Sequence, residues 1–171
     1  GAEPAYVATD RTGRFLLTAY YVAAKVSVHR IGKDGSLSEK PIQEISTDEK
    51  AHAVLTDPTN QFAFVPHTGP NAIYQFRFDE KTGHLSPNDP LILGTGENSG
   101  PRQLACHPKL DVVFFDYEQA CAIAAFNLNH KTGQLSFRER LSSVPDNFRE
   151  TRSNARIEIH PSGKFVYVAN R

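Results

Sequence analysis

Apolar and polar residues alternate along short segments of this chain, and turn residues separate the segments. The clearest example runs from 72 to 79, where the aromatic residues Tyr74, Phe76 and Phe78 occupy every second position. A period of two places alternate side chains on opposite faces of a β-strand. Together with its surroundings, this segment predicts four strands joined by turns, at 52–56, 61–65, 72–79 and near 91–93.

Two signatures recur along the chain in step with this pattern. The first occurs at intervals of 47, 50 and 53 residues, in Tyr6–Gly13, Ala53–Asn60, Gln103–Leu110 and Arg156–Gly163. The second, Lys-Asp/Thr-Gly-x-Leu, recurs at intervals of 48 and 50 residues and begins at Lys33, Lys81 and Lys131. Repeats of this length made of short strands and turns are typical of a β-propeller, with one four-stranded antiparallel blade per repeat.

The repeats divide the chain into approximate units. Three of them are complete, and the last is not: 1–50, 51–100, 101–153 and 154–171. A propeller typically needs about four to eight blades to close. The sequence therefore predicts an all-β partial propeller of about three and a half blades. The remaining blades of the same ring are its expected structural partners.

The bulk composition excludes several classes of function. The chain carries 19 basic and 19 acidic residues and has no basic stripe, so no nucleic-acid partner is expected. No apolar run approaches the length of a membrane-spanning helix, so no membrane partner is expected either. Because tryptophan is absent, the Trp-Asp class of propellers is excluded.

The cysteines and histidines predict neither a disulfide nor a metal site. Cys106 and Cys121 fall on the first and third strands of one predicted blade, about 10 Å apart, which is too far for a disulfide. Two buried thiols fit a reducing compartment, and a cytoplasmic location is expected. No two histidines have metal-ligand spacing and no cysteine pairs with a histidine, so no metal and no cofactor are expected.

The antiparallel strand order decides which polar residues share one face of the ring. In a propeller the first strand of each blade lies innermost, so the loops entering it and the loops between the second and third strands open on one face. His52 and Arg102 occupy the same repeat position at the entrance to the innermost strand, and Glu118 lies in the loop between the second and third strands of the third blade. The repeat register therefore predicts these three side chains at the mouth of the central channel.

Three further residues are expected near the same mouth as substrate-binding groups. His67 lies beside the loop position that corresponds to Glu118 one repeat earlier. Arg149 and Arg152 lie in the long connection that enters the fourth innermost strand. Sites of this kind combine a few convergent polar groups from several elements.

A structural interpretation of the same residues stays open. A histidine at a strand start is commonly a hydrogen-bonded structural residue, which applies to His52. Arg102 and Glu118 could form an ion pair that ties blades together. His107 and His160 precede proline in turns on the opposite face, and turn chemistry explains them without a site.

Three longer motifs lie in the second half of the chain: Gly100–Pro108, Pro145–Arg152 and His160–Arg171. The first resembles the Gly-Pro-Arg-His-x-x-x-His-Pro element of the lactonase family of seven-bladed β-propellers, which includes the propeller-type 6-phosphogluconolactonases. The second resembles that family's Pro-x-Asn-Phe-x-x-Thr-Arg segment, and the third is similar to its Pro-x-Gly-x-x-x-Tyr-x-x-Asn-Arg strand pair. One departure is Gln103, which stands where the pattern often has histidine.

The resemblance implies a metal-independent sugar lactonase, most specifically one that converts 6-phosphogluconolactone to 6-phosphogluconate. It also extends to a fungal branch of the fold, the muconate-lactonizing cycloisomerases, which leaves a second activity open. Carried over by motif, the site proposed for that branch falls on His52, Arg102 and Glu118, with Arg152 as a fourth residue.

These residue types suit the hydrolysis of a lactone. A neutral His52 would activate water, Glu118 would orient it, and Arg102 and Arg152 would bind an anionic group and stabilise the oxyanion. In a cycloisomerase the arginines would clamp substrate carboxylates while His52 or Glu118 moves the proton. An alternative of another class is a non-catalytic propeller that serves as a binding or interaction module.

Overall fold

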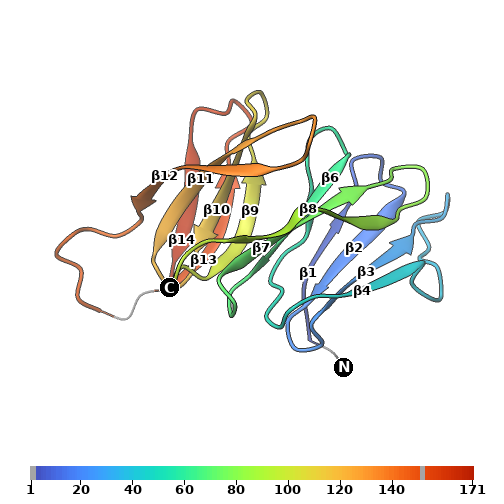
Figure 1. The fold of residues 1–171 in the computed structure, drawn as a ribbon, viewed down its shortest axis with the longest axis horizontal. Coiled ribbons are helices and arrows are strands. Elements are labelled where there is room, and N and C mark those ends of the chain that lie inside the picture. Colours follow the sequence, from blue (N-terminus) through green and yellow to red (C-terminus); the bar gives the residue numbers. More distant parts are fainter. Residues whose placement is uncertain (1–2, 151–152) are drawn as a thin grey trace.

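A computed structural model of the chain describes residues 3–150 and 153–171. Within these ranges every regular element is a β-strand (Figure 1), and none of the described residues forms a helix able to span a membrane. The strands form three four-stranded sheets and one two-stranded sheet, all antiparallel. The predicted all-β fold of four-stranded antiparallel blades is confirmed.

Each sheet takes consecutive strands in sequence order, as a meander joined by short turns. The first blade consists of β1 (Pro4–Thr9), β2 (Phe15–Tyr20), β3 (Lys25–Arg30) and β4 (Gln43–Ser46). The second consists of β5 (Leu55–Thr56), β6 (Phe62–His67), β7 (Ala72–Phe78) and β8 (Leu85–Gly94). The third consists of β9 (Pro101–Cys106), β10 (Val112–Tyr117), β11 (Ala122–Leu128) and β12 (Leu135–Ser142). The two-stranded sheet pairs β13 (Asn154–Ile159) with β14 (Val166–Asn170).

The first strands of the four sheets face a common space. A cavity of about 340 Å³ is lined by residues of all four, among them Tyr6 of β1, Leu55 of β5, Cys106 of β9, and Arg156 and Glu158 of β13. The first strand of each sheet is therefore the inner one, as the repeat register requires.

Two strands of the second blade differ in extent from the prediction. The first strand was expected over 52–56, but β5 covers only Leu55–Thr56. Pro66 lies on the facing strand β6, and proline has no N–H group for the ladder, so regular pairing stops before it. The fourth strand is longer than expected, because β8 begins at Leu85 directly after the turn.

Two hydrophobic cores lie between successive blades. In the first core, Tyr74, Phe76 and Phe78 of β7 pack against Phe15 and Leu17 of β2. The second core lies one blade further on and is built in the same way. It joins Phe62 and Phe64 of the second blade to aromatic and aliphatic residues of the third, including Phe115, Ala124, Phe126 and Leu128. Each blade is thus held by apolar burial against its neighbours, as in other repeat folds.

In two of its three copies, the glycine of the second signature has a packing role. Gly83 and Gly133 both adopt a positive φ, of +80° and +75°. A Cβ at Gly83 would lie 2.5 Å from the ring of Phe15 in the preceding blade, and one at Gly133 would overlap the ring of Phe62. Only glycine therefore allows this turn to close against the neighbouring blade.

We expect Gly83→Ala to lower the free energy of unfolding of the full-length protein by about 2–5 kcal/mol, through backbone strain and overpacking combined. Gly13→Ala is the matched control, because Gly13 has a similar φ of +70° but no atom within 4 Å of an added Cβ. Denaturant unfolding of both variants measures the difference. Equal losses in the two variants would contradict the packing role.

Candidate active site

A β-bulge places Arg102 at the inner edge of the third blade. Asp116 of β10 pairs with Gln103 of β9, whereas the next residue, Tyr117, pairs with Pro101. Arg102 is therefore the extra residue on β9. Bulges of this kind redirect a side chain and are frequent beside functional sites.

The second blade has the same irregularity. Leu55 pairs with Phe64 and Ala51 bridges to His67, so the β5 side advances four residues while the β6 side advances three. His52, at the repeat position of the extra residue in the third blade, lies within this irregularity. At the corresponding bulges of the first and fourth sheets the register skips Ala5 and Ala155. Polar side chains thus occupy this bulge in two neighbouring blades only, within the described residues.

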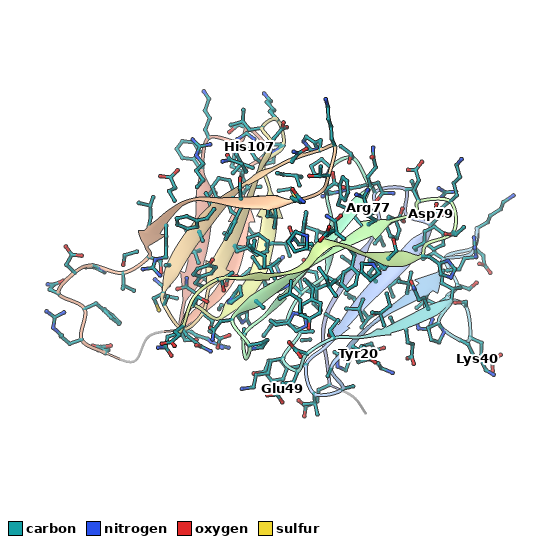
Figure 2. All side chains as sticks on the ribbon, viewed as in Figure 1. Tyr20, Lys40, Glu49, Arg77, Asp79 and His107 are labelled. Carbon is teal, nitrogen blue, oxygen red and sulfur yellow. The ribbon has the colours of Figure 1, made fainter. Side chains whose placement is uncertain are left out.

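The candidate residues and the two histidines of the Pro-containing turns lie at opposite ends of the molecule. Figure 2 shows Tyr20 and Glu49, which flank the loops near His52, at the lower end of the view and His107 at the upper end. The imidazole of His107 accepts two backbone N–H groups of its own turn at Nδ1 and donates from Nε2 to the carbonyl of Gly163. His160 likewise bonds within its own turn. Turn chemistry accounts for both, as expected.

Glu118 is held between two guanidinium groups. Its Oε2 lies 3.2 Å from Arg102 Nε, although the N–H is not directed well enough for a hydrogen bond, and its Oε1 accepts a 2.8 Å bond from Arg171 Nη2. Arg171 Nε also donates to Ser153 Oγ at 3.1 Å. The Arg102–Glu118 contact joins β9 to the turn that follows β10 in the same blade, and Arg171 links the third blade to the fourth sheet. In the resulting cluster these three side chains carry one more positive than negative charge, which the nearby carboxylate of Asp116 balances when it is ionised.

His52 shares the electrostatic field of this cluster. Burial lowers the pKa of His52, the positive charge of Arg102 lowers it further, and Glu118 partly opposes both effects. Its ring packs edge-on against Tyr21 at 5.7 Å between centroids. Its Nδ1 atom is buried and has no hydrogen-bond partner among the described residues. The imidazole is therefore neutral at pH 7, and the oxygens of Glu118 bind the arginines rather than His52.

Sequence reasoning missed two members of the cluster. Arg171 follows the second strand of its sheet, as Glu118 does one repeat earlier. The repeat register could therefore have placed Arg171 on the same face as Glu118. Asp116 is the one acidic residue in the apolar strand β10 and is fully buried. Burial raises the pKa of Asp116 to about 6, against the lowering effects of the Gln103 N–H and the charge of Arg102.

His67 makes its contacts within its own blade and not with the cluster. It is the last residue of β6 and is fully buried, with its ring 4.5 Å from that of Tyr74. Its Nδ1 lies 2.9 Å from the carbonyl oxygen of Val65, to which it donates. Burial lowers the pKa of His67 to about 4, so the ring is neutral and packs inside the blade.

The pKa of His67 predicts a pH dependence of stability. The folded state resists protonating His67 down to about pH 4, whereas an unfolded histidine binds a proton near pH 6.5. The stability is therefore fully present above pH 6.5 and is lost as the pH falls to 4. We expect the wild type to lose about 3 kcal/mol more than His67→Phe between pH 7 and 4. Both proteins retain Asp116, so a constant difference across this range would contradict the prediction.

Only one of the two arginines predicted in the long connection, Arg149 and Arg152, lies within the described residues. The exposed Arg149 donates from Nη1 to the carbonyl oxygens of Asp146 and Phe148, within its own loop. Arg152 lies outside the described residues. Of the six predicted site residues, the structure thus brings together His52, Arg102 and Glu118.

Both cysteines are thiols, as predicted. Cys106 ends β9, and burial raises its pKa to about 12, so it stays protonated. Cys121 precedes β11 rather than lying on it, which corrects its predicted position on the third strand. Within 3–150 and 153–171, no three His, Cys, Asp or Glu side chains gather closely enough to hold a metal ion.

Comparison with known proteins gives a consistent result. The model of the family described as "Lactonase, 7-bladed beta-propeller" matches residues 1–171. A 6-phosphogluconolactonase of Pectobacterium carotovorum is 34% identical over 169 residues, which are 99% of this chain and 50% of that protein. Its counterpart in Serratia proteamaculans is 32% identical, with the same coverage of both chains.

Two solved structures share the fold. A periplasmic gluconolactonase of Pseudomonas aeruginosa superimposes with a TM-score of 0.86 at 24% identity, over 98% of this chain and 50% of that one. A protein of Lactobacillus plantarum superimposes with a TM-score of 0.88 at 24% identity and the same coverage. The chain belongs to the lactonase family of seven-bladed β-propellers. It spans about half the length of the curated relatives that it matches.

Proposed function

We propose that the full-length protein hydrolyses a sugar lactone, and we favour 6-phosphogluconolactone as the substrate. The observation that carries this proposal is the cluster of Arg102, Glu118 and Arg171 beside a neutral His52. The cluster combines a base with positive charge at one face of the ring. Family membership and the name 6-phosphogluconolactonase, borne by several relatives, support this substrate class.

In the proposed mechanism His52 is the general base. Its neutral imidazole takes a proton from water as the water oxygen attacks the lactone carbonyl carbon. The C=O π bond opens to an oxyanion, which the guanidinium of Arg102 stabilises. The intermediate then collapses, the ring C–O bond breaks, and the imidazolium returns its proton to the leaving oxygen. The product is the hydroxy acid, and His52 ends neutral as it began.

Arg171 is suited to hold the anionic group of the substrate. Its side chain is 55% exposed, whereas that of Arg102 is 11% exposed, so Arg171 is the more accessible guanidinium. A planar guanidinium binds phosphate or carboxylate through two parallel hydrogen bonds. Glu118 keeps both arginines in place and balances part of their charge. Arg152 remains a proposed fourth member.

The two alternatives receive less support. No observation specific to a muconate-type cycloisomerase separates it from the lactonase. The binding-module alternative would need these residues mainly as structural ties. The Arg171–Glu118 bond is such a tie, but it leaves unexplained the buried Nδ1 of His52, which has no hydrogen-bond partner within residues 3–150 and 153–171.

The proposed function is tested by turnover of a lactone panel with the full-length protein. The panel contains 6-phosphogluconolactone, gluconolactone and a muconolactone, each measured with and without EDTA. We expect the highest kcat/KM for the phosphorylated lactone, and no effect of EDTA. Activity on muconolactone alone would favour the cycloisomerase, and no turnover of any lactone would favour the binding module.

We also propose a cytoplasmic location, because both cysteines are thiols. Cell fractionation of the source organism tests this. Recovery of the protein in a periplasmic fraction would contradict it.

A further inference from the structure

Apart from Arg102 Nε, which lies 3.2 Å from Glu118 Oε2, two buried polar atoms beside Glu118 lack hydrogen-bond partners among the described residues. They are Arg102 Nη1, a donor, and Asp116 Oδ2, an acceptor. Asp116 is fully buried, and the side chain of Arg102 is only 11% exposed. Buried polar groups in folded proteins almost always have a partner, so a donor and an acceptor left open in one region call for an explanation.

The strand register places the two residues together. Asp116 lies directly opposite Gln103, and Arg102 is the extra residue of the bulge next to that pair. The backbone N–H of Gln103 donates to Asp116 Oδ1 at 2.5 Å, which fixes one oxygen of the carboxylate and leaves the other open. Arg102 is fixed in turn by the proximity of its Nε to Glu118.

The electrostatics agree with this placement. Burial lowers the pKa of the Arg102 guanidinium, and the charge of Asp116 opposes this effect more strongly than the charge of Glu118 does. Glu118 Oε2 is 3.2 Å from Arg102 Nε, and the strand register places Asp116 beside the bulge that carries Arg102. Yet no direct hydrogen bond joins Arg102 Nη1 to Asp116 Oδ2.

A neighbouring donor and acceptor are complementary to a hydroxyl group. A hydroxyl oxygen accepts the guanidinium N–H while its own hydrogen is donated to the carboxylate. An anionic oxygen would be repelled by Asp116, and an ammonium group by Arg102. The pair therefore selects a neutral O–H, which both water and a sugar possess.

We propose that Arg102 Nη1 and Asp116 Oδ2 form a subsite for a single hydroxyl oxygen, supplied by the substrate or by an ordered water. Asp116 is then a specificity residue if the oxygen belongs to the sugar, and a positioning residue for water otherwise. The kinetic part of this proposal rests on the proposed lactonase function. The existence of the subsite does not.

The kinetic test is Asp116→Asn in the full-length protein. The substituted amide keeps an oxygen for the Gln103 N–H and presents N–H instead of an acceptor to the subsite. We expect kcat/KM to fall about 10- to 100-fold, as for loss of a hydrogen bond to a charged group. Asp57→Asn is the matched control, because Asp57 is equally buried and its carboxylate accepts hydrogen bonds from its own turn, with one further contact to His130 Nδ1 at 3.8 Å. It is expected to lower the melting temperature and leave kcat/KM unchanged.

Singly deoxygenated lactones separate the two sources of the hydroxyl. If the substrate supplies it, one deoxy lactone is hydrolysed equally well by wild type and Asp116→Asn, because that substrate never makes the bond. If water supplies it, every deoxy lactone shows the same ratio of wild-type to variant kcat/KM as the parent. Wild-type kcat/KM for Asp116→Asn with all substrates would overturn the proposal.

A crystal structure of the full-length wild type provides a readout that needs no activity and no variant. We expect an oxygen within hydrogen-bond distance of both Arg102 Nη1 and Asp116 Oδ2, either water or a sugar hydroxyl in a complex with gluconate. No such oxygen in either structure would overturn the subsite, whatever lactones are hydrolysed. An occupied subsite in a protein that hydrolyses no lactone would support it and remove the proposed function instead.

Discussion

His52→Gln is expected to lower kcat for lactone hydrolysis by about 10²–10⁴ while the full-length protein remains folded. Glutamine approximates the size of histidine and retains hydrogen bonding, but it cannot take a proton from water near pH 7. The side chain packs against Tyr21 and lies within the bulge, so the substitution changes few other contacts. Steady-state assays of lactone hydrolysis measure kcat and KM, and a thermal melt is the folding control.

The pH profile distinguishes a base from a structural histidine. Burial and the charge of Arg102 lower the pKa of His52. In free enzyme the neutral form is active, so kcat/KM should fall only as the pH drops through this lowered pKa, below the ordinary value for histidine. This acidic limb should disappear in His52→Gln. A variant with wild-type turnover and an unchanged profile would remove His52 from the mechanism.

The strands were predictable because each depends on local sequence. Alternation in 72–79 and the turn signatures are sufficient to place β6, β7 and the turns that join strands within a blade. The short β5 was not predicted, because the effect of Pro66 depends on which neighbouring strand its missing N–H faces. That is a property of register rather than of propensity.

The convergence of His52, Arg102 and Glu118 followed from the repeat register, since equivalent positions in successive blades lie side by side. Arg171 was missed although the same register places it one repeat after Glu118. Asp116 is harder to find, because a single acid in an apolar strand has no periodic signal.

His67 shows where the pattern is ambiguous. Every residue of β6 is buried, because blades cover both faces of its sheet. Alternation then cannot tell an inward-packed histidine from one that points into the channel mouth. Only the packing of its ring against Tyr74 decides the matter.

The second large effect is expected for Arg102→Ala, which should lower kcat/KM by about 10²–10³ and affect both kcat and KM. The guanidinium is proposed to stabilise the oxyanion, and it is already fixed beside Glu118. Arg171→Ala is the matched control, because Arg171 binds the same carboxylate but is more exposed. That control should mainly raise KM.

Arg102→Ala should also move the acidic limb of the kcat/KM profile to higher pH. The positive charge of Arg102 lowers the pKa of His52, so its removal lets that pKa rise and His52 becomes protonated at a higher pH. Arg102→Lys keeps the positive charge but loses the planar guanidinium with its paired N–H donors. It should therefore leave the acidic limb of the pH profile near its wild-type position while recovering only part of the rate. A residue that merely ties β9 to β10 would change the melting temperature in both variants and leave the limb where it was. An unshifted limb in Arg102→Ala, with kcat/KM intact, would therefore reassign the Arg102–Glu118 pair to structure.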